Sequence, residues 1–353
     1  MSWIASYLSG RTQTVQMPYT DGTGCRRSMN SSISNIDIGV PQGSILGPLL
    51  FLLFIIDLPD CISELFAEIC LYCDDTEVSL KAKTIQDLVA RVFGECEKII
   101  QWFVDNKLII NSTKTKVMNF SISNSKENSQ SSYLIGNNVI DVCDSTKFLG
   151  IWIDKHLKFG DHIDYVCNKL SSGIFVLRNL AAFADSKVLL TAYYGMIFPH
   201  LSYAVAIWGS ECFRTNFVFK LQKKAVRIVF NLPYRASCRE IFKQKKILTF
   251  PCLYMFNCVT FVKKHPQMFR VDHKQSRYNL RPTNNVDIPS HKTSFFERHL
   301  RYRGAQLFNA LPETLKADDN VGRFERGAKS MFLEKVFYSV GDFLSTSPPV
   351  NSN

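Results

Sequence analysis

Two adjacent carboxylates, Asp74 and Asp75, are the residues of this chain whose type and spacing best suit chemistry. They follow an alternating apolar segment at residues 66–73 and precede a short β-rich segment at residues 76–80, which predicts a tight hairpin turn at the pair. Hard carboxylate oxygens at a fixed, exposed point can bind Mg²⁺ that is shared with a substrate phosphate. The alternative is a solvated turn, because aspartate is common in turns for its local hydrogen bonds.

A glycine-rich loop precedes this pair by roughly 30 residues. Residues 39–44 read GVPQGS, and glycines in such a loop let the backbone approach a nucleotide or base closely. The apolar run at residues 45–56 is predicted to form a buried helix with Ser44 as its N-cap. This run is shorter than the roughly 20 residues that cross a bilayer.

The loop and the carboxylate pair together resemble motifs B and C of reverse transcriptases of non-LTR retrotransposons, the jockey-like elements in particular. The thirteen residues from Gly39 to Phe51 (GVPQGSILGPLLF) resemble motif B, and the six from Leu71 to Thr76 (LYCDDT) resemble motif C. Weaker similarities are spread over the rest of the chain. Residues 102–115 resemble motif D, residues 147–163 motif E, and residues 199–209, 221–225 and 281–312 the region that follows the polymerase domain.

The resemblance implies an RNA-directed DNA polymerase that uses Mg²⁺ or Mn²⁺, an RNA template, a DNA primer and dNTPs. It also implies a role for each matching residue: Asp74 and Asp75 bind the metal, Lys114 donates a proton to departing pyrophosphate, Gln42, Gly43 and Tyr72 line the nucleotide and template site, and Leu149, Gly150 and Ile151 approach the primer end.

The metal site that the resemblance implies is incomplete in this sequence. The family supplies another aspartate from motif A, on a strand well before motif B, and only Asp21 and Asp37 precede motif B here. Asp21 lies in a predicted turn and Asp37 lies two residues before the glycine loop. We therefore expect little or no polymerase activity from the chain alone. We also expect an unpaired sheet edge, which favours association.

The elements around the motifs follow from periodicity and capping. Thr84 and Asp87 have capping-box spacing, and apolar residues then keep to one helical face up to Phe103. Two β-rich stretches, residues 12–19 and 26–38, flank a turn at residues 21–24. Residues 111–120 are predicted to form a strand and residues 121–132 a flexible serine-rich loop.

Positive charge gathers in the second part of the chain. Residues 1–120 have a net charge of −3 and residues 121–353 a net charge of +14, within a total of +11. On a predicted helix at residues 217–232, four cations lie opposite the apolar face and are predicted to contact a nucleic-acid backbone: Lys220, Lys223, Lys224 and Arg227. The alternative is an ordinary solvated helix face.

Aromatic residues are interleaved with the cations that follow this helix. They suit stacking on unpaired bases or, as we prefer for Phe250, Tyr254 and Phe261, a place in the core. The full set is Phe242, Phe250, Tyr254, Phe261, Phe269 and Tyr278.

The eleven cysteines and the first residues of the chain indicate its compartment. An odd number of cysteines and the lack of a secretory-signal pattern predict free thiols in a reducing compartment. Cys70 and Cys73 would face opposite sides of a strand, which argues against a shared metal or disulfide. We expect an intracellular protein, cytoplasmic or nuclear, without a membrane span; the sequence leaves its oligomeric state open.

These observations predict an α+β fold: an incomplete polymerase palm, with an antiparallel sheet and helices, followed by a mostly helical thumb and a basic extension. The expected divisions are a partial palm at residues 1–120, the serine loop at 121–132, motif E and the start of the thumb at 133–182, and a helical basic region at 183–353. The predicted function is a reverse transcriptase fragment of a non-LTR retrotransposon. The alternative is a non-catalytic nucleic-acid-binding remnant of a mobile element.

Overall fold

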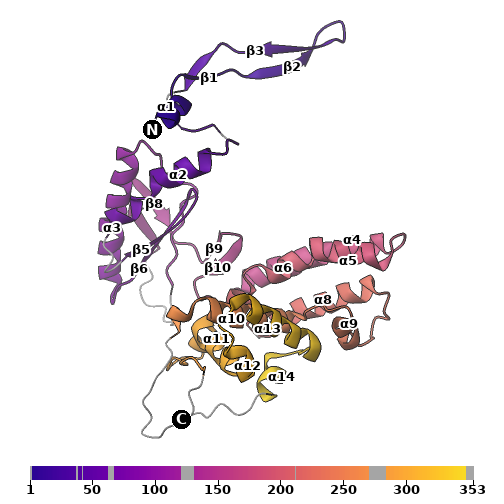
Figure 1. Ribbon diagram of the computed structural model, residues 1–353. Helices are drawn as coiled ribbons and strands as arrows, with labels where there is room; N and C mark the ends of the chain where they lie inside the picture. Colours follow the sequence, from indigo (N-terminus) through magenta and orange to yellow (C-terminus); the bar gives the residue numbers. More distant parts are fainter. Residues whose placement is uncertain are drawn as a thin grey trace. The chain divides into compact units, whose positions relative to one another are not determined.

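A computed structural model describes residues 2–36, 39–41, 43–62, 67–120, 131–210, 212–269 and 284–346 (Figure 1). It combines helices with short antiparallel sheets, which confirms the predicted α+β class. The chain divides into two compact units, unit 1 with residues 1–117 and 126–142 and unit 2 with residues 118–125 and 143–353. The palm, thumb and their predicted limits stay predictions.

Unit 1 begins with one long hairpin whose two arms are each interrupted, so that it consists of two successive pairs of strands. After α1 (Ser2–Leu8), β1 (Arg11–Gln13) pairs with β4 (Ser34–Ile36), and β2 (Gln16–Thr20) pairs with β3 (Arg26–Asn30). Asp21 fixes the intervening turn, because its carboxylate accepts from the Thr23 and Cys25 amides and pairs with Arg27 at 2.6 Å. The predicted turn at residues 21–24 is confirmed.

The rest of unit 1 surrounds a small apolar core. Its elements are α2 (Gly47–Ile55), a 3₁₀ turn (Leu58–Cys61), β5 (Ala67–Tyr72), β6 (Asp75–Leu80), α3 (Ile85–Asp105), β7 (Ser132–Ile135) and β8 (Asn138–Asp141). Ile55, Leu58 and Ile99 form the centre of this core, and Ile69, Leu71 and Val78 of the β5–β6 hairpin pack against it. The hairpin is therefore held by α2 and α3.

Two predictions for unit 1 helices had different outcomes. Thr84 caps α3 as predicted, since its hydroxyl accepts from the Asp87 amide at 3.1 Å. The predicted burial of the apolar run is wrong, because Gly47 and Ile55 are the buried residues of α2, whereas Leu49, Leu52 and Leu53 are at least half exposed. A helix that is apolar on every side gives no period from which its packed side can be read.

Unit 2 starts with one hairpin and is otherwise helical over its described residues. Strands β9 (Ser145–Phe148) and β10 (Ile151–Asp154) pair antiparallel. The helices are α4 (Gly160–Leu180), α5 (Ser186–Met196), α6 (Phe198–Ser202), α7 (Val205–Trp208), α8 (Thr215–Val229), α9 (Arg239–Gln244), α10 (Phe250–Lys264), α11 (Leu300–Asn309), α12 (Glu313–Lys316), α13 (Val321–Lys335) and α14 (Val340–Ser345). The prediction that the chain beyond motif E is mainly helical is confirmed.

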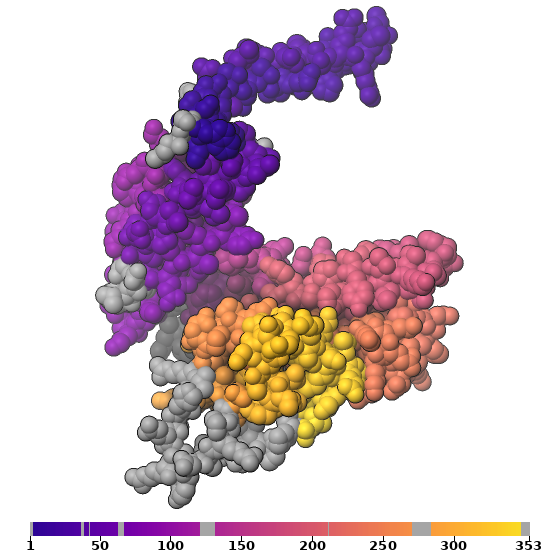
Figure 2. All heavy atoms as spheres, viewed as in Figure 1, coloured from indigo at the N-terminus to yellow at the C-terminus, as the bar shows by residue number. Residues whose placement is uncertain are grey.

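The core of unit 2 is large and continuous, and α10 lies at its centre. Helix α10 packs against α7, α11 and α13, and Figure 2 shows the yellow carboxyl-terminal helices packed directly on the orange ones. A buried glutamine, Gln222 of α8, crosses this core. Its amide donates to the Tyr193 hydroxyl at 3.0 Å and the Leu248 carbonyl at 2.8 Å, and it accepts from the Phe250 amide at 2.7 Å. Every polar group of this buried side chain therefore has a partner.

No helix in the described part of the chain is both long and apolar enough to cross a membrane. All eleven cysteines are free thiols, as predicted.

Candidate active-site hairpin and nucleic-acid interface

The β5–β6 hairpin presents the two predicted metal ligands at its tip. Tyr72 pairs with Asp75, so the loop consists of Cys73 and Asp74. The predicted turn at Asp74 and Asp75 is therefore displaced by one residue: Asp74 lies in the loop, and Asp75 is the first residue of β6. Both aspartates are exposed. Their carboxylates accordingly point into solvent-accessible space rather than into the core.

Alternation along the hairpin separates a packed face from an open one. On β5, Ala67, Ile69 and Leu71 are buried or half-buried, whereas Glu68, Cys70 and Tyr72 are exposed. Residues paired across an antiparallel ladder share a face, so Asp75 lies on the open face beside Tyr72. The core contacts of the packed face thus set the position of the carboxylate on the open face.

The loop residue Cys73 has a left-handed backbone, with φ of 53°. Two-residue hairpin loops need positive φ in at least one central position, where glycine, asparagine or aspartate is usual. Cysteine has a Cβ that crowds the backbone in this region. The tip of the hairpin therefore stores a small amount of strain.

The glycine loop before α2 has the backbone shape that its sequence predicts. Gly39 and Gly43 have φ of 79° and 81°, and Gly43 is exposed. Ser44 is not the N-cap residue, because α2 begins at Gly47, but its hydroxyl accepts from the Gly47 amide at 3.1 Å and so still satisfies the first turn. Gln42 lies outside the described residues.

Lys114 lies in a turn that follows α3, where the sequence predicts a strand. The Asn111 side chain accepts from the Thr113 amide at 3.1 Å, and the Lys114 amide donates to the Asn111 carbonyl, also at 3.1 Å. Such local bonds compete with ladder pairing, and only Val117 of this segment makes a bridge, to Val142. The strand prediction for residues 111–120 is wrong. The Lys114 side chain is exposed.

The predicted primer-proximal residues form the tip of the β9–β10 hairpin in unit 2. Phe148 pairs with Ile151, which leaves Leu149 and Gly150 as a two-residue loop with φ of 44° and 84°. The Tyr203 hydroxyl donates to the Leu149 carbonyl, and a Cβ on Gly150 would lie 3.3 Å from the Tyr203 ring. Sequence reasoning missed Tyr203 because 54 residues separate it from Leu149.

A buried histidine supports the base of this hairpin. His162 of α4 lies against Trp208 with ring centres 5.0 Å apart, and its Nδ1 accepts from the Trp152 amide at 3.4 Å. Burial, reinforced by the charge of Lys147, lowers the pKa of His162 to about 4. A neutral imidazole is therefore the form that the folded hairpin requires.

The predicted nucleic-acid cations lie on α8, with different surroundings. Lys220 is exposed, whereas Lys223, Lys224 and Arg227 are half-buried. Arg227 donates from Nε to the Ala236 carbonyl at 3.0 Å, and burial together with Arg227 lowers the pKa of Lys223. No ion pair formed within the described residues involves a cation of α8.

The buried face of α8 only partly follows the predicted one. The sequence pattern puts six residues on the apolar face of this helix: Val218, Leu221, Ala225, Ile228, Val229 and Leu232. Val218, Ala225 and Val229 are buried as predicted, but Leu221, Ile228 and Leu232 are half-buried. Phe219, Gln222 and Val226 are buried in their place.

The aromatic residues beyond α8 belong mostly to the core. Phe250 and Tyr254 are buried and Phe261 packs against the core, as preferred from the sequence, and Phe242 and Phe269 are buried too. Stacking on bases is therefore excluded for Phe242 and Phe269. Tyr278 lies outside the described residues.

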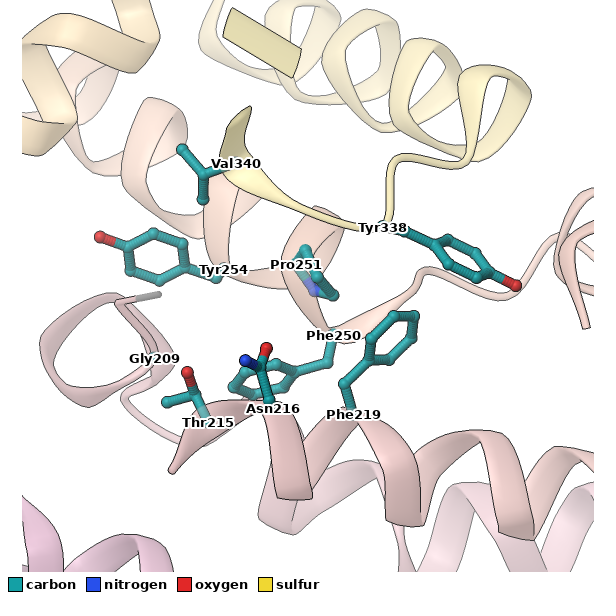
Figure 3. A pocket seen from close by; sticks show the side chains of 9 residues that line it. All are labelled: Gly209, Thr215, Asn216, Phe219, Phe250, Pro251, Tyr254, Tyr338 and Val340. Atoms are coloured by element: carbon teal, nitrogen blue, oxygen red, sulfur yellow. The ribbon is translucent and has the colours of Figure 1, made fainter. Parts of the chain in front are cut away.

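One small pocket lies between α8, α10 and the segment that enters α14. The rings of Phe219, Phe250 and Tyr338 gather around Pro251 (Figure 3), and the space of about 20 Å³ fits one water molecule. It contains none of the predicted site residues. The pocket offers no room for a nucleotide.

The structure thus distributes the predicted site residues over both units. Tyr72, Asp74 and Asp75 share one hairpin, and Gly43 and Lys114 belong to the same unit. The three primer-proximal residues and the α8 cations belong to unit 2. The described residues contain no group of three or more histidine, cysteine or acidic side chains that could by itself enclose a metal. Two exposed carboxylates suit a hard cation that is completed by substrate phosphate oxygens.

Comparison with known proteins agrees with the motifs. Residues 2–153 match the family described as reverse transcriptase (RNA-dependent DNA polymerase). The probable RNA-directed DNA polymerase from transposon X-element of Drosophila melanogaster is 24% identical over 253 residues, which cover 70% of this chain and 26% of that protein. The RNA-directed DNA polymerase from mobile element jockey of Drosophila melanogaster is 27% identical, over 69% of this chain and 26% of that protein. The polymerase of the same name from Drosophila funebris is 28% identical, over 67% of this chain and 26% of that protein.

These matches identify a reverse transcriptase region in the chain. Among reverse transcriptases they support the jockey-like, non-LTR type, which confirms the resemblance seen in motifs B and C. The family generally uses divalent metals and binds a nucleic-acid template and primer. The chain spans about a quarter of the length of these relatives. No solved structure matches it significantly.

Proposed function

We propose that this chain forms part of an RNA-directed DNA polymerase and supplies two of its metal-binding carboxylates, Asp74 and Asp75. The observation that supports this most strongly is the pair of exposed aspartates at the tip of a hairpin whose other face is packed, within a region that matches the reverse transcriptase family. Asp74 and Asp75 would hold Mg²⁺ or Mn²⁺ through their carboxylate oxygens, and the bound ion would supply charge neutralisation for the substrate phosphates.

The reaction is an in-line displacement at the α-phosphate of a dNTP. A bond forms between the primer 3′ oxygen and the α-phosphorus, the bond from the α-phosphorus to pyrophosphate breaks, and the proton of the 3′ hydroxyl passes to solvent water. We assign Lys114 to protonating the departing pyrophosphate. Gln42, Gly43 and Tyr72 line the nucleotide and template site, and Leu149, Gly150 and Ile151 support the primer end.

Asp74 and Asp75 act in this proposal with a further aspartate of the motif A type. Asp21 cannot fill that role, because Arg27 and the amides of its own turn already engage its carboxylate. The β5–β6 sheet has two strands within the described residues, so each strand has an outer edge that could pair with a motif A strand.

Primer extension on an RNA template with dNTPs and Mg²⁺ tests this proposal. We expect little product from the 353-residue chain, and robust product when the preceding part of a jockey reverse transcriptase domain is fused before it. Asp74→Asn should abolish that product. Glu68→Gln, which removes an exposed carboxylate from the far end of the same hairpin, should not. Two results would contradict the proposal: an unchanged amount of product from the Asp74→Asn variant, or as much product from the 353-residue chain alone as from the fusion.

A second candidate is a non-catalytic nucleic-acid-binding protein. The α8 cations favour it, because none of them forms an ion pair among the described residues, so their positive charge is not neutralised there, and Lys220 is exposed. Salt-dependent oligonucleotide binding without primer extension by the fused protein would distinguish it from the polymerase.

A further inference from the structure

An exposed aromatic pair stands at the amino-terminal end of α8, beside its cations. Phe213 is 77% exposed and Phe217 is 44% exposed, and their rings pack edge to face at 5.2 Å and 87°. Single exposed apolar residues are normal on a protein surface, but contiguous ones mark interaction sites. Two large aromatic rings exposed side by side therefore indicate a binding surface.

The pair continues into a line of cations on one side of the helix. Phe217, Lys220 and Lys224 are spaced by three and four residues, which places them along one face of α8, and Phe213 in the turn before the helix extends this line through its contact with Phe217. The Lys220 ammonium lies 4.9 Å from the centre of the Phe217 ring. We call these four residues the α8 stripe.

The stripe lies on a rigid support. Val218, Ala225 and Val229 on the opposite face of α8 are at most 2% exposed, and α8 packs along α4. The edge-to-face contact further restricts both rings. The stripe therefore exists before any ligand binds, and little conformational freedom is left to lose on binding.

The positive charge of the stripe indicates which kind of partner binds it. Helix α8 contains no acidic residue, and the ion pair formed at its amino-terminal end within the described residues joins its N-cap residue Arg214 to Asp164 at 2.9 Å. A second apolar protein surface would leave Lys220 and Lys224 without a counterion. A single-stranded nucleic acid supplies both a base that can stack on an aromatic ring and a phosphate for the neighbouring ammonium.

We propose that the α8 stripe is a stacking platform for unpaired bases of a single-stranded nucleic acid. This rests on the proposed nucleic-acid partner and names its form and its contacts: Phe213 and Phe217 hold bases, and Lys220 and Lys224 hold the phosphates beside them. Stacking does not depend on base identity, so the platform accepts any sequence.

Oligonucleotide binding by F213A/F217A in the full chain tests the platform. Stacking contributes about 1–3 kcal/mol per base, or roughly 5- to 150-fold in affinity, so the variant, which lacks both rings, should bind single strands at least roughly 5-fold more weakly. Wild-type protein should bind a strand that lacks its bases as weakly as the variant binds the intact strand. Binding of both proteins to blunt duplex should be equal.

A matched control removes another exposed phenylalanine from the same unit. Phe183 is 79% exposed and follows the carboxyl end of α4, whereas the Arg214 side chain lies beside Gly160, the first residue of that helix, about 30 Å away along its axis. F183A should leave single-strand affinity unchanged. K220Q/K224Q should instead lower the slope of log affinity against log salt by about 1.4, or about 0.7 per lost phosphate contact.

Distinct outcomes separate failure of the platform from failure of the nucleic-acid partner. If wild-type protein binds no oligonucleotide at low salt, the nucleic-acid partner itself is wrong. If wild-type binds and F213A/F217A binds equally well, or loses duplex and base-free strands to the same degree, the stacking platform is overturned. Self-association of wild-type protein that F213A/F217A abolishes, without a change in single-strand affinity, would also overturn it. Circular dichroism and the melting temperature of the variant should match wild-type, since both rings are exposed.

Discussion

The Tyr203 hydroxyl donates a hydrogen bond of 2.5 Å to the Leu149 carbonyl, across 54 residues of sequence. The bond fastens a two-residue loop with two left-handed residues to the segment between α6 and α7. The tip of the β9–β10 hairpin is consequently positioned by helices of unit 2 and not by its own strands alone.

Tyr203→Phe should loosen this tip without unfolding the unit. An intramolecular hydrogen bond contributes about 1 kcal/mol, so the free energy of unfolding should fall by roughly that amount, and amide exchange at residues 148–152 should accelerate. Tyr194→Phe is the control, because the Tyr194 hydroxyl has no hydrogen-bond partner among the described residues. Equal effects of the two substitutions would show that the bond to Leu149 contributes nothing.

Gly150→Ala should destabilise the same hairpin by a separate route. A residue other than glycine at φ of 84° costs about 1 kcal/mol, and the new methyl group would lie 3.3 Å from the Tyr203 ring. Gly24→Ala serves for comparison, since Gly24 has φ of 83° and no atom within 4 Å of the added Cβ. Thermal unfolding should show a larger loss for Gly150→Ala than for Gly24→Ala, and the opposite order would contradict the contact.

Cys73→Gly should stabilise the β5–β6 hairpin or leave its stability unchanged. Glycine relieves the left-handed strain at φ of 53° but adds freedom to the unfolded chain, so the net gain should not exceed about 1 kcal/mol. Cys70→Gly, three residues earlier on extended β5, should lose about 0.5–1 kcal/mol. Urea titration of both variants measures the difference between their changes in unfolding free energy. If the turn is not strained, the two glycine substitutions should destabilise the protein equally.

Acid should destabilise unit 2 through His162. Its folded pKa of about 4 lies below the ordinary value of 6.5, so between these two pH values the unfolded chain binds more protons than the folded one. Stability is then complete above pH 6.5 and falls as the pH drops towards 4, by at most roughly 3 kcal/mol.

His162→Asn separates this effect from those of other histidines, because burial lowers the pKa of His200 and His299 as well. Asparagine keeps an acceptor for the Trp152 amide but does not titrate. The difference in unfolding free energy between wild-type and variant should change across pH 6.5 to 4. A difference that is constant over this range would rule out His162 as the titrating group.

Much of the hairpin that bears the carboxylates could be predicted from the sequence, because alternation along β5 and the capping signal at Thr84 are local properties. The register of the hairpin tip could not be predicted from the sequence. Cys73 has a positive φ, and cysteine normally avoids this conformation, so its presence in the sequence does not indicate a turn there. The sequence also does not predict that the leucines of α2 and the rings of Phe213 and Phe217 are exposed. The exposure of a side chain depends on which other helices and strands pack against it. The apolar sequence of α2 has no polar face that would indicate its solvent-exposed side.

The predicted strand at residues 111–120 failed for a related reason. Asn111 offers its own side chain to the following amides, and this local turn competes with any ladder that the β-prone residues favour.

Gln222 links α8 to α5 and to the start of α10 through three hydrogen bonds in the interior of unit 2. If any one of these partners moved away alone, it would leave a buried donor or acceptor unsatisfied, at a cost of about 1–3 kcal/mol. Partial opening of this region is therefore scarcely easier than opening all of it. The three helices unfold as one cooperative block, and the slowest-exchanging amides of the chain should be shared among them.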